Sequence, residues 1–288
     1  MIRKDLSFAS RVFALVLILL CSNLLIAQKK PKSTNPLEGF LDTQFWLGLK
    51  MGGNVTQAFP ETRTTGFSPI NYSADSLEKS YEDFNLPGAH MGLEMNFYHR
   101  GFSISFQPIY KRSRYKYSSE LEWSGESSGN RFTTRYDVEQ RLDVIELPLM
   151  VKYDFIRSGN IRPFVMAGGF HSFIASAQKE VGITQTDFSS GNALTSDGGT
   201  TIIGVKDAFQ GFSGVSGGVG MNLDYWNIRT VFEIKYSRAL TAATKTNVQE
   251  NEFASLGETN DEIFLRDINV SLAFVFPFRF IDQQFKAR

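Results

Sequence analysis

The chain has 288 residues, and its 30 Lys and Arg balance its 30 Asp and Glu, so the formal net charge is zero. A chain without a basic excess lacks the usual mark of a nucleic-acid-binding protein, and we expect no nucleic-acid partner. The 26 Phe, 10 Tyr and 24 Gly are many for this length. Aromatic and glycine enrichment with little helical periodicity favours an all-β barrel.

The N-terminus has the order of a secretory signal peptide. Basic residues precede an apolar run from Val12 to Ile26, and Ala27 supplies a small residue at the cleavage position. We expect residues 1–27 to be a cleaved signal; the alternative, an uncleaved anchor, would use a run that is short for a membrane span. The only cysteine, Cys21, lies inside this segment, so the mature protein would contain no disulfide.

Residues 142–177 carry the clearest pattern in the chain. From Ile145 to Phe155 apolar residues alternate with polar or small ones, which predicts a β-strand with two chemically opposite faces. A Ser-Gly-Asn turn at 158–160 leads to a second strand near Arg162, so the stretch predicts a hairpin. Two readings fit it. In a soluble barrel the apolar face points inward, and in an outer-membrane barrel it meets lipid.

The lengths of the connections favour the membrane reading. Strand-like segments occur at 44–52, 89–98, from 102, at 142–155, from 162, and at 211–225, 228–236 and 265–278. The links alternate between short turns and long polar loops, the latter at 54–88, 118–134, 179–208 and 241–264. Short turns on one rim and long loops on the other are typical of outer-membrane barrels, with the turns and both chain ends on the periplasmic side.

Aromatic residues gather near the short turns, as in a belt at a membrane interface. They are Phe97, Tyr98, Phe102, Tyr153, Phe155, Phe164, Tyr225, Trp226, Phe276 and Phe278. We therefore predict an eight-stranded antiparallel up-and-down transmembrane β-barrel at residues 44–280. A periplasmic segment, 28–43, would precede it, and a short tail, 281–288, would follow. The expected partners are outer-membrane lipid, the barrel-insertion machinery during assembly, and proteins that contact the loops or the periplasmic turns.

An eight-stranded lumen has room only for side chains, so charged residues on the polar faces are expected to pair inside it. The candidates form a structural charge network, with an ion path as the alternative reading: Lys50, Glu94, Glu146, Lys152, Asp154, Arg229, Glu233 and Lys235.

Signals for catalysis or for a cofactor are weak. The histidines at 90, 99 and 171 are scattered, without an HExxH or GxSxG motif, and His171 is expected to be a hydrogen-bonded filler in the lumen. The acidic run at 249–262 lacks the spacing of a dedicated calcium site and is better explained as a solvated loop. We predict a non-enzymatic protein without catalytic, cofactor or metal residues.

The hairpin resembles that of the PorT-like outer-membrane β-barrel proteins. The likeness rests on Leu147-Pro148-Leu149, Lys152, Arg162-Pro163-Phe164 and Gly168-Gly169. It implies an eight-stranded outer-membrane barrel and a possible accessory role in type IX protein secretion. The alternative functions are a surface adhesin or receptor acting through its long loops and, as a third class, a soluble lipocalin-like ligand carrier.

Overall fold

The computed structural model describes residues 43–62, 79–124, 131–156, 160–189, 193–225, 228–245 and 261–277. The chain divides into two units, Met1–Asp42 and Thr43–Arg288, and all described residues belong to the second. The expected signal peptide, the expected C-terminal tail and residues 28–42 of the expected periplasmic segment lie outside the described residues, whereas Thr43 begins β1. Within the described ranges no helix is long and apolar enough to cross a membrane.

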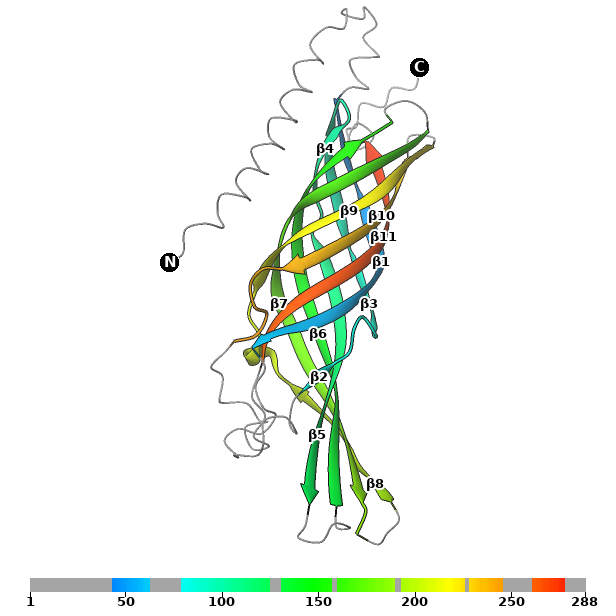
Figure 1. Ribbon diagram of the computed structural model, residues 1–288. Coiled ribbons are helices and arrows are strands. Elements are labelled where there is room, and N and C mark those ends of the chain that lie inside the picture. The colour runs from blue at the N-terminus through cyan, green and yellow to red at the C-terminus, as the bar shows by residue number, and fades with distance from the viewer. Residues whose placement is uncertain are drawn as a thin grey trace, which may run out of the picture. The chain divides into compact units, whose positions relative to one another are not determined.

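Unit 2 is a closed antiparallel barrel (Figure 1). Its wall has eight positions, here called staves; each stave is one β-strand, except that β4 and β5 together make one. Neighbours in the chain are neighbours in the sheet, and β1 pairs with β11 to close the ring. The staves are β1 (Thr43–Thr62), β3 (Pro87–His99), β4 (Phe102–Phe106) with β5 (Ile109–Ser124), β6 (Arg131–Asp154), β7 (Ile161–Asp187), β9 (Phe212–Tyr225), β10 (Ile228–Ala239) and β11 (Glu262–Pro277). The predicted fold class is therefore confirmed. The described part of the sheet contains eleven strands where eight were predicted, because one stave is divided into β4 and β5 and because β2 and β8 are added.

One stave is interrupted at Gln107-Pro108, between β4 and β5. Proline has no N–H to give to a ladder, and here the N–H of Gln107 donates to the Pro148 carbonyl at 3.0 Å. The Pro108 carbonyl still accepts the N–H of Leu93 at 3.0 Å. The stave therefore continues through the proline, although its pairing with β3 and β6 is locally irregular.

The pairing register fixes how tightly the barrel is wound. A row of paired residues that leaves β1 at Gln57 passes through Arg266 of β11 and crosses the remaining staves. It returns to β1 at Leu47, ten residues earlier. Eight strands with this stagger tilt by about 35–45° and leave an interior that side chains fill.

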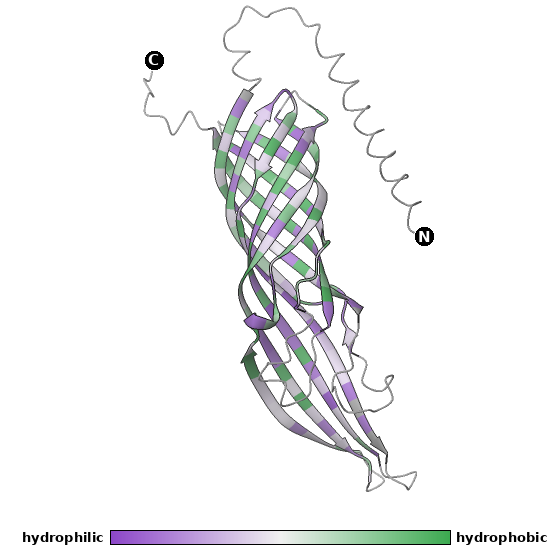
Figure 2. Ribbon diagram, turned by 90° about the vertical axis from the view of Figure 1, so that its left-hand side faces the viewer, coloured by the Kyte–Doolittle hydropathy of each residue, from purple (hydrophilic) through white to green (hydrophobic). Residues whose placement is uncertain are grey.

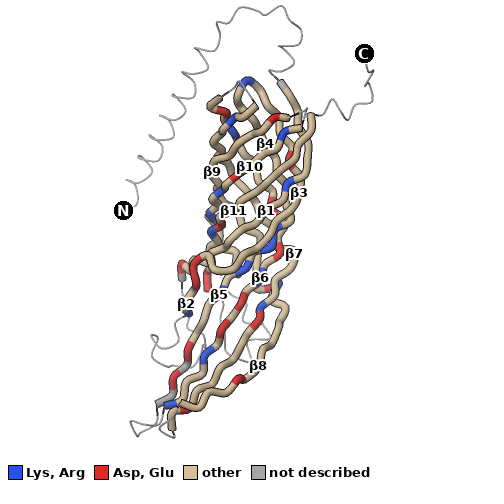
Figure 3. Tube along the Cα trace, turned by 90° about the vertical axis from the view of Figure 1, so that its right-hand side faces the viewer, with Lys and Arg blue, Asp and Glu red and all other residues tan. Residues whose placement is uncertain are grey.

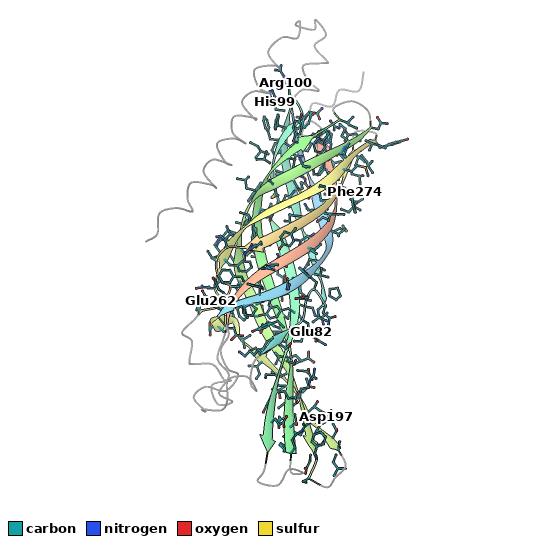
Figure 4. All side chains as sticks on the ribbon, viewed as in Figure 1. Glu82, His99, Arg100, Asp197, Glu262 and Phe274 are labelled. Atoms are coloured by element: carbon teal, nitrogen blue, oxygen red, sulfur yellow. The ribbon has the colours of Figure 1, made fainter. Side chains whose placement is uncertain are left out.

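The apolar face of the barrel points outward. Leu49 and Met91 are 61% and 66% exposed, whereas Lys50, between Leu49 and Met51, is 2% exposed. Figure 2 shows the same alternation of hydrophobic and hydrophilic residues along the staves, and Phe274 points away from the barrel in Figure 4. This polarity suits a barrel in lipid and excludes the lipocalin-like alternative, in which the apolar face lines the cavity.

The expected aromatic belt is correct only in part. Phe97, Phe155 and Tyr225 are exposed near the end where the short turns lie, here called the turn end and marked by His99 and Arg100 in Figure 4. Tyr98 and Phe164, however, are 5% and 1% exposed and point into the lumen, because they alternate with the outward-facing residues of β3 and β7. Trp226 and Phe278 lie outside the described residues.

Three staves continue far beyond the other rim of the barrel and form a projecting sheet (Figure 1). It consists of residues 114–124 of β5, 131–141 of β6, 176–187 of β7 and the added strand β8 (Leu194–Gly204), which pairs with β7. The short β2 (Ser80–Tyr81) pairs with β5, and a single 3-10 turn, η2 (Lys206–Ala208), follows β8. The expectation of polar loops at 118–134 and 179–208 was wrong for most of these residues, because strand pairing extends through them.

Candidate functional site

The lumen is filled by three layers of side chains, and the layer nearest the turn end is built on arginine. Arg229 donates from Nε to Asp224 Oδ1 at 2.7 Å and from Nη2 to Oδ2 at 3.2 Å, which is a two-pronged contact. Arg162 also bonds Asp224. The Arg229 guanidinium lies 4.1 Å from the ring centroid of Trp46, a cation–π distance. This layer therefore closes the turn end of the lumen with stacked and paired groups.

The middle layer is centred on Glu233 of β10. Its carboxylate pairs with Lys50 of β1 and with Lys152 of β6, so one side chain joins three separate staves. Lys152 also pairs with Glu94, and Lys50 donates to Gln107 Oε1 at 2.9 Å. Each of these side chains is at most 2% exposed. Buried charges of this kind are tolerable only when paired, and here two lysines and two glutamates balance one another in charge.

The middle layer contains a second ionic cluster, which lies nearer the far rim. Glu146 accepts from Lys111 and, at 3.4 Å, from Lys235. Lys111 also donates to Asp267 Oδ2 at 3.0 Å, and Thr56 Oγ1 donates to Asp267 Oδ1 at 2.6 Å. The network thus continues from β1 through β5, β6, β10 and β11 without leaving the interior.

Glycines on the inner face make room for the larger lumen residues. A Cβ at Gly220 would lie 2.3 Å from an atom of the Phe164 ring, and one at Gly214 would lie 2.5 Å from the Phe170 ring. Both distances are far below van der Waals contact. The glycine-rich stretch of β9 therefore lets two aromatic rings of β7 pack directly against its backbone.

The third layer is apolar and blocks the far rim. It joins inward residues of the staves with η2 and its neighbours. Leu142, Val144 and Phe212 are at most 1% exposed. The cavity beside this layer measures about 10 Å³, which is space for one water molecule, and is lined by residues that include Lys79, Tyr117 and Asp261. Among the described residues the lumen is therefore filled at this end as well.

The outer face of the projecting sheet carries a shallow hollow near its tip. Arg131 stacks on Phe188 with its guanidinium carbon 4.7 Å from the ring centroid, and Arg135 lies beside it with Asp137. The hollow measures about 160 Å³ and is lined by Glu120, Arg131, Thr133, Arg135, Thr184, Thr186 and Phe188. Figure 3 shows charged residues of both signs along these strands. An arginine, an aromatic ring and several hydroxyls together make a surface suited to binding a macromolecule.

Comparison with known proteins agrees with this architecture. Residues 26–245, more than half of the chain, match the family described as "Outer membrane protein beta-barrel domain". The chain belongs to this family. It is an outer-membrane β-barrel protein, embedded in outer-membrane lipid. No curated protein matches its sequence.

Three solved structures of outer-membrane barrels are similar to this barrel at low identity. The attachment invasion locus protein Ail of Yersinia pestis shares 8% identity, with 81% of this chain and 99% of that chain covered and a TM-score of 0.30. Neisserial surface protein A shares 10%, with coverage of 80% and 95% and a TM-score of 0.31. The outer membrane protease OmpT of Escherichia coli shares 9%, with coverage of 82% and 97% and a TM-score of 0.27.

All eight residues predicted for the lumen network lie inside this outer-membrane barrel. Seven of them take part in the ion pairs described above, and Asp154 accepts from Asn222 at 3.3 Å with Arg162 at 4.0 Å. The sequence analysis did not include four further charged members: Lys111, Arg162, Asp224 and Asp267. Lys111, Asp224 and Asp267 continue the period-2 polar face of a strand that was identified, so extending the alternation could have found them. Arg162 shares its face of β7 with the buried Phe164 and Met166, so alternation alone would not have found it.

The network is electrically balanced. Its cations are Lys50, Lys111, Lys152, Arg162, Arg229 and Lys235. Its anions are Glu94, Glu146, Asp154, Asp224, Glu233 and Asp267. A selective ion path would require a row of one sign with open space beside it, whereas this barrel has six of each sign in contact.

The histidines occupy three unrelated places. His90 lies in the lumen and its Nε2 is 2.9 Å from Ser271 Oγ. The expectation that His171 faces the lumen was wrong: it lies on the outward face between the buried Phe170 and Ser172, with Nδ1 2.8 Å from Ser213 Oγ. His99 is at the turn end. Within the described ranges no group of three or more His, Cys, Asp or Glu could hold a metal ion, and residues 249–260 of the acidic run lie outside those ranges.

Proposed function

We propose that this protein is a non-enzymatic surface-binding protein, in which the barrel is an anchor and the projecting sheet is the binding part. The observation that carries the proposal is the continuation of β5, β6 and β7 beyond the apolar band, with β8 added. By the usual orientation of outer-membrane barrels the short turns face the periplasm, so the projecting sheet faces the outside of the cell.

Three features support a binding role over a transport role. The lumen is filled and charge-balanced, so transport through it has no route. β8 is the outer strand of the projecting sheet, with Ile202 68% exposed, and no described strand pairs with its second edge, which can accept an extended partner strand. The hollow beside Arg131 and Phe188 lies on the same sheet and supplies a site for a side chain of a partner.

The accessory role in type IX secretion is a second proposal and rests on the resemblance of the hairpin to PorT-like proteins. The motif residues Lys152, Arg162 and Gly168 all serve the lumen in this barrel: two join the ion pairs, and a Cβ at Gly168 would lie 2.8 Å from the Met150 sulfur. Because these motif residues pack the lumen, the resemblance to PorT-like proteins supports a shared fold. It supports a shared secretion partner less directly.

Gene deletion with complementation separates the two proposals. The deletion strain would be complemented with the wild type, with the tip variant Arg131→Ala/Phe188→Ala, or with the control Arg114→Ala, which removes an outward arginine outside the hollow. We would measure cell–cell and cell–surface adhesion and the secreted proteome, after confirming equal amounts of folded protein by the heat-dependent shift in gel mobility.

We expect adhesion to fall in the deletion and in the tip variant, to be restored by the wild type and the control, and the secreted proteome to stay unchanged. Unchanged adhesion in the deletion strain would refute the binding proposal. A changed secreted proteome, restored equally by the tip variant, would instead support the secretion role.

A further inference from the structure

Two arginines sit side by side on the outer wall of the barrel. Arg238 of β10 and Arg266 of β11 are directly paired positions of neighbouring strands, and Arg266 is also paired with Gln57 of β1. Arg238 alternates with the buried Ser237 and Ala239, and Arg266 with the buried Leu265 and Asp267, so both face outward. Arg238 is exposed and Arg266 half-buried.

Both arginines lie at the edge of the apolar band. On β11 the outward residues between Arg266 and the turn end are all apolar, from Ile268 to Phe276. Ten residues of a strand tilted by about 40° rise about 25 Å, which is the height of the lipid-facing band of an outer-membrane barrel. On β10 the ten residues from Ile228 to Arg238 rise by the same amount. Along β10 and β11, Arg238 and Arg266 are therefore the first outward charges beyond the apolar band on the side of the projecting sheet.

Neither positive charge has an ion-pair partner among the residues that the structure describes. The Arg266 guanidinium stacks on Phe59 at 4.1 Å, which orients its plane and leaves its N–H edge available. Like charges directly opposite each other on paired strands are destabilising, so this arrangement calls for an anion between them.

On the opposite side of the barrel, two neighbouring outward arginines share a carboxylate of the protein itself. Arg112 of β5, also outward and next to the apolar band, donates from Nε to Asp143 Oδ1 at 2.7 Å, and Arg141 reaches the same carboxylate at 3.5 Å. There the chain supplies its own anion. At Arg238 and Arg266 the described residues supply no such carboxylate, so this place is open to an external anion.

We propose that Arg238 and Arg266 bind a phosphate of a phosphorylated glycolipid in the outer leaflet. A guanidinium fork matches phosphate in two-pronged geometry, and a ligand at this depth must keep its phosphate at the rim and its acyl chains against the apolar wall. The outward residues below the pair, Tyr236 and Ile268, give those chains an apolar surface. This site is independent of the binding role of the projecting sheet.

The test uses the full-length protein folded in detergent and three probes: phosphorylated lipid A, the same lipid with its phosphates removed, and inorganic phosphate. The readout is the temperature at which the folded, fast-migrating band is lost on heating. We expect phosphorylated lipid A to raise this temperature, and Arg238→Gln/Arg266→Gln to require at least about tenfold more lipid for half of that rise.

Three controls make the result decisive. Arg238→Lys/Arg266→Lys keeps the charge without the fork and should respond between the wild type and the glutamine variant. Lys116→Gln/Lys206→Gln removes two cations beyond the band and should respond like the wild type. The single variants Arg238→Gln and Arg266→Gln serve if the double variant does not fold. An equal rise in the glutamine variant, with dephosphorylated lipid, or with inorganic phosphate alone would overturn the proposal.

Discussion

Strand β6 runs through two surroundings, and its two faces exchange their chemistry between them. In the barrel its outward residues are apolar, such as Leu149 and Val151, and its inward residues include Glu146 and Lys152. In the projecting sheet the outward residues are charged, such as Asp137 and Glu139, and the inward Val138 is buried. The same set of β6 positions faces outward along the whole strand. What changes is the surroundings of the outer face, which meets lipid in the barrel and water in the projecting sheet.

The exchange falls at an irregularity in the neighbouring strand. Between Asp143 and Val144 of β6 the pairing with β7 shifts by one residue, because Ile174 pairs with Val144 and Ser176 with Asp143. The bulged residue of β7, Ala175, reverses which positions of β7 face inward. Phe170 is inward before the bulge and Val181 after it. The bulge lets an apolar set of β7 residues point inward in both halves.

The strongest test of this comparison reverses one charge on the inner face of the barrel and one charge on the outer face of the projecting sheet. Glu146→Lys would bring a third cation beside Lys111 and Lys235, and we expect a loss of about 3–5 kcal/mol in unfolding free energy because the buried charges lose their partner. The matched control on the same strand, Glu139→Lys, affects a half-exposed pair with Arg114 and should cost less than about 1 kcal/mol. Urea unfolding in lipid vesicles would measure both. Equal losses would show that the lumen pairs do not stabilise the barrel.

A charge placed on the outer faces gives the next largest difference. Leu272→Arg puts a guanidinium in the middle of the apolar band and should destabilise the barrel by about 2–4 kcal/mol. Thr200→Arg, on the exposed β8, should change the unfolding free energy by less than about 0.5 kcal/mol. The same vesicle experiment, followed by Trp fluorescence, would compare them. A tolerated Leu272→Arg would contradict the assignment of this face to lipid.

The smallest effect belongs to the tip of the projecting sheet. The N–H of Ser189 donates to Asp187 Oδ1 at 2.8 Å, and this hydrogen bond lowers the pKa of the Asp187 carboxyl below its ordinary value. A lowered pKa in the folded state means that the contact stabilises the tip at neutral pH and is lost as the pH falls below that of a free carboxyl. NMR titration in micelles should show the low pKa. The protection factor of the Ser189 amide, which is the exchange rate of an unprotected amide at the same pH divided by its own, should fall at acidic pH in the wild type and not in Asp187→Asn. An ordinary pKa for Asp187 would remove this contact from the account.

The sequence predicts the barrel better than the sheet beyond it. Period-2 alternation and short turns identify all eight staves, because lipid on one side and a packed lumen on the other impose a strict pattern on every strand. β8 carries no such pattern: water reaches both of its faces, and the run Leu194–Gly204 reads like a polar loop. Its pairing with β7 is a tertiary contact, and the sequence pattern of β8 itself does not predict it.

The sequence could predict which charged residues face the lumen, but it could not predict which of them pair with each other. Alternation tells which side chains face inward, but Lys50 and Glu233 meet across 183 positions of the chain. Their contact depends on the stagger of the whole barrel, which only the register of all the staves determines.

The pairing of β1 with β11 has a consequence for the order of events in assembly. Thr62 meets Glu262 across a chain separation of two hundred residues, so the first stave to be made must wait for the final one before its outer edge is covered. During that interval β1 presents unpaired N–H and C=O groups together with an apolar face, a combination prone to aggregation. The barrel therefore cannot be completed strand by strand as the chain is synthesised. To avoid aggregation, the unfinished chain requires a chaperone that holds it until β1 and β11 can pair.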